Sequence, residues 1–330
     1  MSQLEAEIAE IPARLVGVAA ANRAALAEAA RRFRAAPPPA LFTIARGTSD
    51  AVALYASYRF APALGLPVGS FAPSLASLDA VRVTRGGVWS LAISQSGRSP
   101  DLVEAQAAFA DAGGTRLALV NDTASPLARG ADLVLDQAAG AERSVAATKS
   151  FACSLLAVDL LAESLADGAG DLDARCRRIA DAAAGAMAAG VDLSPLDDAT
   201  GAYVIGRGAS LPVAGEAALK LKETAGLHAE AISAAEVMHG PRAIAGHNLP
   251  VLGFAGPGPA GRSVAEALAT LARQGSPTIL VTAERVPESV REAAPAALIA
   301  AFYAALPPFA RRRGADPDRP PALTKVTMTH

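Results

Sequence analysis

Short, continuous apolar segments alternate with longer alanine-rich segments along most of this 330-residue chain, and that alternation most limits the folds open to it. Half-exposed strands would alternate apolar and polar residues. The continuous segments instead predict strands covered on both faces, as in a parallel sheet. Helical segments between such strands predict doubly wound α/β units. The predicted strands are residues 41–45, 88–93, 115–120, 132–135, 202–206, 250–255 and 277–282.

Two stretches of the sequence repeat each other. ARGTSDAVA (45–53) and GRGASLPVA (206–214) share Arg, Gly, Ser, Val and Ala in register, and each follows an apolar segment. We interpret them as an internal duplication. No clear strand follows residue 282, so the last strand of the second copy is either cryptic or missing. The predicted organisation is N-terminal helices over 1–35, a first α/β domain over 36–165, a linker helix over 166–197, a second domain over 198–310 and a tail over 311–330.

Composition and charge give no support for several kinds of partner. The formal net charge of −2 gives no electrostatic reason to expect nucleic acid or an anionic membrane surface. No apolar stretch reaches the roughly 18 residues of a membrane span, and the N-terminus is acidic where a signal peptide would be basic, so we expect a cytoplasmic protein. Cys153 and Cys176 have no metal-binding spacing. We therefore predict two buried thiols, no metal and no cofactor.

The segment ISQSGRSP (93–100) concentrates hydroxyl groups between a predicted strand and a predicted helix. A glycine-containing turn at a helix N-terminus offers backbone N–H groups, and the neighbouring serines and glutamine add donors suited to a phosphate monoester. A simpler interpretation is that one serine caps the helix. A second hydroxyl motif, RGTS (46–49), follows the neighbouring strand and favours phosphate. The counterpart in the second copy, GFAGPGPAGRS (253–263), has a single serine, so only the first copy is equipped for this ligand.

A second group of candidate residues lies in the second copy. Glu216, Lys220 and Glu223 are spaced i, i+4 and i+7, which places them on one face of a helix. They form either a surface ion-pair ladder or, because their neighbours are apolar, a half-buried network holding a general base. His239, directly before Gly-Pro, is either structural or an acid–base group. Lys325 lies in a tail that either frays or crosses a site.

Taken together, these motifs resemble the sugar isomerase (SIS) family, and in particular the isomerase half of glutamine:fructose-6-phosphate aminotransferases. The resemblance implies two flavodoxin-like α/β/α sandwiches, with the C-terminal tail over the active site. The matching segments, spread over residues 46–329, are RGTS, SQSGRS, ERSVAATKSF, GRGAS, EAALKLKETAGLHAEA, EVMHGP and LTKVTMT.

The resemblance also implies a role for each matching residue. Glu223 would move a proton between C1 and C2 of the sugar, supported by Lys220 and Glu216. His239 would open the sugar ring from the neighbouring subunit of a homodimer, and Lys325 would form a Schiff base with the open-chain ketose. The implied phosphate ligands are Ser49, Ser94, Gln95, Ser96 and Ser99, and the implied sugar-binding residues are Thr48, Val145, Ala147 (Ser in the aminotransferases) and Thr324.

The departures from the family pattern bear on the reaction. The aminotransferases begin with a glutaminase domain whose nucleophile is an N-terminal cysteine, whereas this chain starts MSQLEAE. We therefore expect the reverse direction, in which glucosamine 6-phosphate and water give fructose 6-phosphate and ammonia. The alternatives are a galactosamine 6-phosphate or fructosamine 6-phosphate substrate, or a synthase half that uses free ammonia or a glutaminase partner. A non-catalytic sugar-phosphate sensor is disfavoured, because no DNA-binding motif precedes the first strand.

Overall fold

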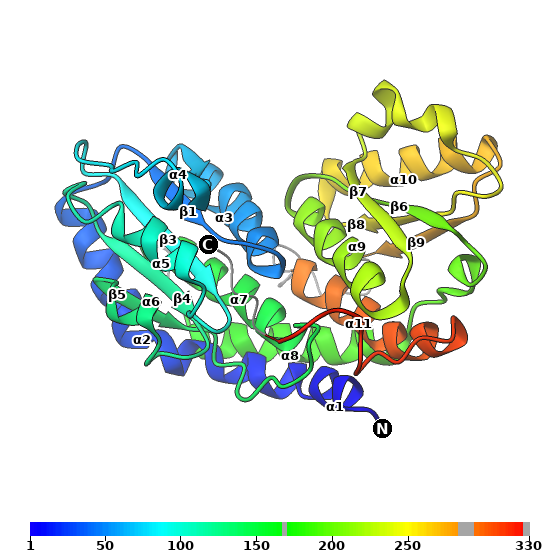
Figure 1. The fold of residues 1–330 in the computed structure, drawn as a ribbon, viewed down its shortest axis with the longest axis horizontal. Helices are drawn as coiled ribbons and strands as arrows, with labels where there is room; N and C mark the ends of the chain where they lie inside the picture. Colours follow the sequence, from blue (N-terminus) through cyan, green and yellow to red (C-terminus); the bar gives the residue numbers. More distant parts are fainter. Residues whose placement is uncertain (167–169, 283–293, 326–330) are drawn as a thin grey trace. The chain divides into compact units, whose positions relative to one another are not determined.

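The computed structural model describes residues 1–166, 170–282 and 294–325. These residues form two compact units, each built around one parallel sheet, and both sheets are labelled in Figure 1. We call them the first-sheet unit and the second-sheet unit. Their described parts are Arg14–Ala141 and Cys153–Cys176 for the first, and Met1–Ala13, Glu142–Ala152 and Arg177–Lys325 for the second.

The sheet of the first-sheet unit has the strand order β2-β1-β3-β4-β5, with all neighbours parallel. The chain moves from β1 to one edge and then from β3 to the other edge. The order therefore reverses between β1 and β3, and ligands of open α/β sheets bind beyond the strand ends at such a point. The strands are β1 (Leu41–Ile44), β2 (Val68–Ser70), β3 (Trp89–Ser94), β4 (Arg116–Val120) and β5 (Leu133–Asp136).

Both faces of this sheet are covered, and every residue of β3 is buried. On one face, Ala92 belongs to a core cluster that includes Leu102 and Phe109. On the other face, Leu91 and Ile93 have no exposed surface. The helices that contribute to this unit are α2 (Ile11–Ala35), α3 (Thr48–Leu64), α4 (Pro73–Ser77), α5 (Pro100–Ala107), α6 (Pro126–Arg129) and α7 (Lys149–Leu165).

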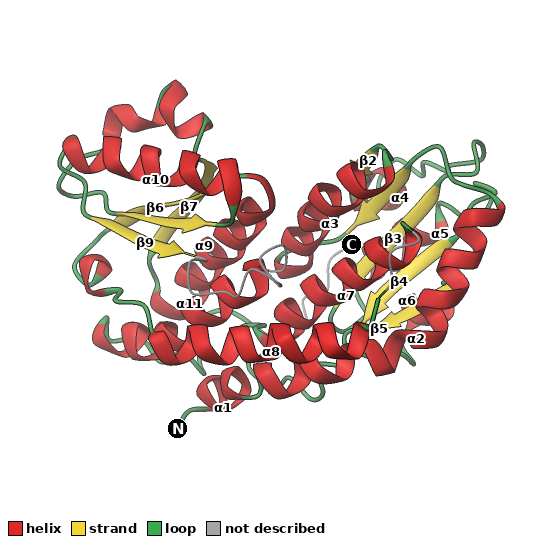
Figure 2. Ribbon diagram, turned by 180° about the vertical axis from the view of Figure 1, so that it is seen from behind, coloured by secondary structure: helices red, strands yellow, loops and turns green. Residues whose placement is uncertain are grey.

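The second-sheet unit repeats this plan with the order β7-β6-β8-β9, again parallel throughout. Its strands are yellow in Figure 2, where β6, β7 and β9 are labelled. Its strands are β6 (Gly201–Gly206), β7 (His228–Ser233), β8 (Val251–Ala255) and β9 (Thr278–Thr282). Its helices are α1 (Gln3–Ala9), α8 (Leu172–Ala189), α9 (Leu211–Ala225), α10 (Gly258–Arg273) and α11 (Ala294–Arg312), with the short 3-10 turns η1 (Ser194–Leu196), η2 (Gly208–Ser210), η3 (Glu236–His239) and η4 (Pro241–Ile244).

The seven predicted strands are confirmed, each with ends within one residue of the prediction. Two strands were not predicted. β2 has only three residues, and β7 is an edge strand with three exposed residues, so neither shows a continuous apolar segment. Within the described residues the second sheet has four strands, one fewer than the first, and residues 283–293 lie outside them.

Two smaller expectations can also be compared with the structure. Cys153 and Cys176 are both buried, as predicted, and neither forms a disulfide within the described residues. Across the described parts of the chain, no helix combines the length and apolar character that a membrane crossing needs.

Candidate functional site

Two loops meet at the point where the first sheet reverses its strand order. β1 and β3 pair side by side, with Ile44 opposite Ala92, so the segments that follow them leave the same edge. One segment leads into α3 at Thr48, and the other leads into α5 at Pro100. The Arg46 guanidinium joins the loops through a 2.9 Å ion pair between its Nε and the buried Asp101 carboxylate. Two helix N-termini with adjacent hydroxyls therefore follow neighbouring strands at one edge of the sheet, an arrangement suited to an anion.

The serines of the second loop are held in a tight turn. Ser94 Oγ accepts a hydrogen bond from Gly97 N–H at 3.0 Å, and Ser96 Oγ accepts one from Arg98 N–H at 3.3 Å. Ser99 occupies the N-cap position of α5, but its side chain makes no capping bond. Simple capping therefore does not account for this cluster, because the hydroxyl hydrogens of Ser94 and Ser96 are not used by these bonds.

Gly97 is required by the shape of this turn. Its φ is +61°, in the region that other residues rarely adopt. A Cβ at this position would also lie 2.1 Å from Ser125 Oγ, and Ser125 is fully buried. Any side chain here would displace the loop that carries the candidate phosphate ligands.

The equivalent point of the second sheet is filled by the chain itself. Ser210 matches Ser49 in the internal repeat, but it is 2% exposed. Its hydroxyl bonds to the carbonyl of Phe254 at 2.7 Å, at the end of β8, and to that of Arg207 at 3.0 Å. Ser49, by contrast, is half-buried, and no hydrogen bond of its side chain is found among the described residues. The two matching serines therefore differ in burial and in hydrogen bonding.

The second-sheet unit contains a chain of charged groups along α9. Glu216 and Lys220 are 0% and 1% exposed, which excludes the surface-ladder interpretation. Lys220 Nζ lies 3.4 Å from Glu216 Oε1 and 2.5 Å from Glu223 Oε2. Burial alone would lower the pKa of Lys220, but the charges of the two glutamates outweigh it and raise that pKa. One buried ammonium thus bridges two carboxylates, and Glu223 lies at the partly exposed end, with 22% of its side chain accessible.

Tyr303, on α11, extends this chain from the other side. Its hydroxyl donates to Glu216 Oε1 at 2.6 Å. Burial raises the pKa of Tyr303 well above its usual value, and the charges of Glu216, Glu142 and Glu223 raise it further. The phenol therefore stays neutral and acts as a donor. All three carboxylates are therefore near enough to Tyr303 for their charges to change the pKa of its hydroxyl.

Glu142 links this group of carboxylates to the C-terminal tail. Lys325 Nζ lies 3.4 Å from Glu142 Oε2, and 24% of the lysine side chain is exposed. The structure therefore places Lys325 in the same surroundings as the predicted group Glu216–Lys220–Glu223. Two residues that the sequence analysis missed, Glu142 and Tyr303, connect them. Tyr303 lies in an alanine-rich helix, and Glu142 lies in the segment ERSVAATKSF, which was noted only for its resemblance.

The remaining predicted site residues are placed as follows. Val145 and Ala147 are half-buried between the buried residues Ser144, Ala146 and Thr148, and Thr324 is exposed. His239 ends η3 and is exposed, and no hydrogen bond of its side chain is found in the described part of the chain. Gln95 follows β3, half-buried, and its carbonyl accepts from Asn121 N–H at 3.2 Å.

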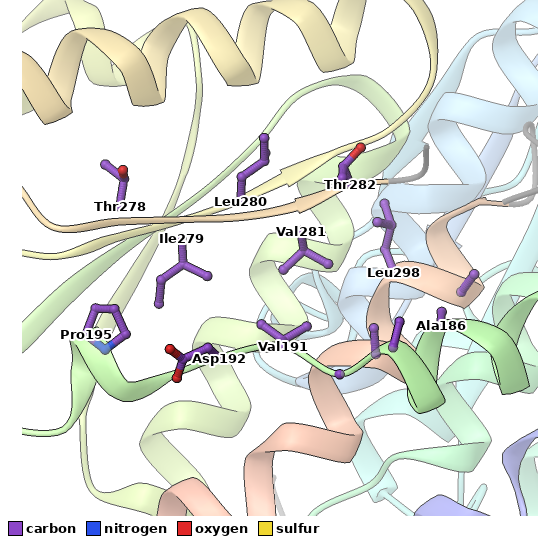
Figure 3. Close-up of a pocket in the computed structure, with 14 residues that line it drawn as sticks. Ala186, Val191, Asp192, Pro195, Thr278, Ile279, Leu280, Val281, Thr282 and Leu298 are labelled. Carbon is purple, nitrogen blue, oxygen red and sulfur yellow. The ribbon is translucent and has the colours of Figure 1, made fainter. Parts of the chain in front are cut away.

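A cavity of about 410 Å³ lies elsewhere in the second-sheet unit, beside the edge strand β9 (Figure 3). Its walls are mostly aliphatic, with Ile279, Val281 and Leu298 among them. Of the described residues that line it, Asp192 alone is ionisable, and its carboxylate is bonded to Ser194. The described residues that line this cavity include no acid–base pair, so we do not take it as the candidate active site.

The described residues thus form a two-unit α/β protein with two doubly wound parallel sheets, a cluster of hydroxyl groups after two strands of the first sheet, and a buried network of charged groups beside the second. The family model for the SIS domain matches residues 36–164 and 196–303. The chain therefore belongs to the SIS domain family.

Individual relatives narrow the comparison. A glutamine–fructose-6-phosphate aminotransferase (isomerizing) from Zymomonas mobilis is 34% identical over 255 residues, which are 73% of this chain and 42% of that protein. The chain thus spans about two fifths of the length of the curated relatives it matches. A solved structure of a candidate phosphosugar isomerase from Silicibacter pomeroyi DSS-3 is 37% identical, with a TM-score of 0.86 over 96% of this chain and all of that one.

A more distant structure shares the fold. Glucosamine-6-phosphate deaminase from Thermotoga maritima superposes with a TM-score of 0.78 over 99% of this chain and all of its own, at 19% identity. The chain is therefore a SIS-family protein with relatives among phosphosugar isomerases and aminotransferases.

Proposed function

We propose that this protein is an amino-sugar phosphate isomerase and deaminase that converts glucosamine 6-phosphate and water into fructose 6-phosphate and ammonia. The observation that carries the proposal is the hydrogen-bonded chain Tyr303–Glu216–Lys220–Glu223, which shares its surroundings with Lys325. Glu223 supplies a carboxylate base, Lys220 a fixed positive charge and Lys325 a second amine. These are the groups needed to move a proton next to a carbonyl carbon.

In the proposed reaction His239 opens the sugar ring and Glu223 carries the proton between C2 and C1. The 2-amino aldose then becomes a 2-imine. Lys325 displaces ammonia from C2 as a Schiff base, and water hydrolyses this to the ketose. The phosphate would bind Ser49, Ser94, Gln95, Ser96 and Ser99, so that binding energy remote from the reacting carbons orients them.

Purified protein incubated with glucosamine 6-phosphate tests the proposal. Ammonia release is followed with glutamate dehydrogenase, and fructose 6-phosphate is measured in parallel. We expect the two products in equal amounts. Ammonia from galactosamine 6-phosphate or fructosamine 6-phosphate alone would correct the substrate and keep the reaction type. No ammonia from any amino-sugar phosphate would overturn the proposal.

The internal repeat supplies a matched pair of variants for the phosphate assignment. We expect Ser49→Ala to raise KM for the phosphorylated sugar about tenfold or more, because a hydrogen bond to a charged group contributes roughly 1.5–3 kcal/mol. Its thermal stability should not change. Ser210→Ala should instead lower stability by about 1–3 kcal/mol, because it removes buried bonds to Phe254 and Arg207. An unchanged KM in Ser49→Ala would move the phosphate elsewhere.

The proposed homodimer with a shared site predicts complementation. His239 is exposed in the single chain, as a residue destined for a partner's site would be. Mixing Glu223→Gln subunits with His239→Ala subunits should restore activity, up to about a quarter of all sites in a random mixture of dimers. Native mass spectrometry verifies that mixed dimers form. Mixed dimers without any activity would show that each site is built within one chain.

A further inference from the structure

Glu142 is fixed more firmly than an ordinary surface carboxylate. Its side chain is fully buried. Oε1 accepts hydrogen bonds from the backbone N–H groups of Thr148 at 3.0 Å and Ser150 at 3.1 Å, and Oε2 accepts one from Ser150 Oγ at 2.6 Å. Burying a carboxylate is costly unless it is hydrogen-bonded and paired with a cation. The three protein donors orient the group, and Lys325 supplies the cation.

The loop that carries Glu142 is itself anchored by the N-terminal helix. Glu7 on α1 is 2% exposed, and its carboxylate accepts from Arg143 N–H at 2.6 Å and Ser144 N–H at 3.2 Å. The tail is anchored to the same helix, because Asp318 accepts from the N–H groups of Gln3 and Leu4, each at 2.8 Å. α1 therefore fixes both the loop before Val145 and the segment that leads to Lys325.

We propose that Glu142 is the positioning residue for the tail lysine: a fixed carboxylate that holds Lys325 Nζ next to the Glu216–Lys220–Glu223 network. This inference rests on the proposed function, which gives Lys325 its role at the sugar carbonyl. The Tyr303 hydroxyl donates a hydrogen bond to Glu216, and the charge of Glu142 also raises its pKa. The amine of Lys325, which contacts Glu142, therefore lies in the surroundings of the Glu216–Lys220–Glu223 network. The sequence comparison alone assigned no role to Glu142.

The proposal also accounts for the proton that Lys325 must lose. An ammonium group cannot attack a carbonyl carbon. Proton transfer from Lys325 Nζ to Glu142 Oε2 gives a neutral amine, whose lone pair forms the N–C bond to C2 of the ketose. When the ketose is the starting compound, the carbonyl electron pair moves to oxygen, which takes one proton from the attacking nitrogen and one from Glu142 and leaves as water. The products are the protonated Schiff base and the Glu142 carboxylate, so no other reactant is needed.

The first test measures docking without any substrate. Lysines are acetylated with sulfo-N-hydroxysuccinimide acetate, and the labelling rate of Lys325 is compared by mass spectrometry with that of Lys222, which is exposed on α9. We expect Glu142→Gln to raise this ratio about fivefold or more, because it removes a charge-assisted bond while keeping an acceptor for Thr148 and Ser150. Asp197→Asn, which removes the carboxylate paired with Arg312, should leave the ratio unchanged. An unchanged ratio in Glu142→Gln would overturn the proposal.

The second test measures the consequence for chemistry. Fructose 6-phosphate is trapped on Lys325 with borohydride, and the adduct is followed by mass against pH. We expect Glu142→Gln to slow trapping about tenfold at neutral pH and Glu142→Asp to restore part of the rate. Trapping at the wild-type rate across the pH range would overturn the positioning role. If wild-type protein forms no adduct while the acetylation ratio changes as expected, the proposed function is wrong but Glu142 still holds Lys325 in place.

Discussion

Replacing Glu223 by glutamine should lower kcat about 10³-fold while leaving the binding of the sugar phosphate nearly unchanged. Glutamine keeps the size of the side chain and can still contact Lys220, but it cannot accept a proton. Loss of a positioned general base typically costs a factor of about 10²–10⁴ in rate. The measurement is steady-state ammonia release, together with the affinity for fructose 6-phosphate by calorimetry.

Glu230→Gln provides the control for this substitution. Glu230 is an exposed carboxylate on β7 in the same unit, so its replacement changes the net charge equally without touching the network. Its kcat should equal that of the wild type. A Glu223→Gln protein that retains wild-type kcat would remove Glu223 as the base and would leave the charged chain on α9 with a structural role.

The largest expected effect on stability comes from Lys220→Met. The substitution removes the one ammonium between Glu216 and Glu223 and leaves their charges close together, one of them fully buried. Breaking a buried ion pair in this way costs about 3–5 kcal/mol. We expect the midpoint of thermal unfolding of this unit to fall by about 10 °C.

Lys222→Met is the matched control for the stability measurement. Lys222 lies two residues further along α9 but is exposed, so its loss should change the midpoint by no more than the scatter of replicate scans. Differential scanning calorimetry at neutral pH compares the two variants with wild type. A midpoint for Lys220→Met equal to that of Lys222→Met would contradict the buried network.

Much of the fold could be predicted because strands with two covered faces carry their signal locally. β3 and β8 are buried along their whole length, and their sequences are continuously apolar. β7 has one covered face and sits at a sheet edge, where the same rule gives no signal. The prediction therefore holds wherever the strand sequence is continuously apolar, as it largely is even in the edge strands β5 and β9, and fails where a strand is very short or is interrupted by polar residues.

The candidate site could likewise be predicted only in part. The spacing of Glu216, Lys220 and Glu223 placed them on one helical face, because helical period is a property of neighbouring residues. Whether that face is buried could not be decided locally, since burial depends on α11 packing against α9. Tyr303 is 87 positions from Glu216, and Lys325 is 183 positions from Glu142. No local pattern marks pairs so far apart.

The sequence by itself determined two parallel sheets, the duplication and the residue types of the candidate site, because strand and helix periods and short motifs are contained within a few residues. The tertiary structure alone decided that Ser210 of the second copy is buried and hydrogen-bonded, whereas Ser49 of the first copy is half-buried. It also decided that Glu142 and Tyr303 join the site. These outcomes depend on packing between distant segments, where the cost of burying a polar group selects its partner.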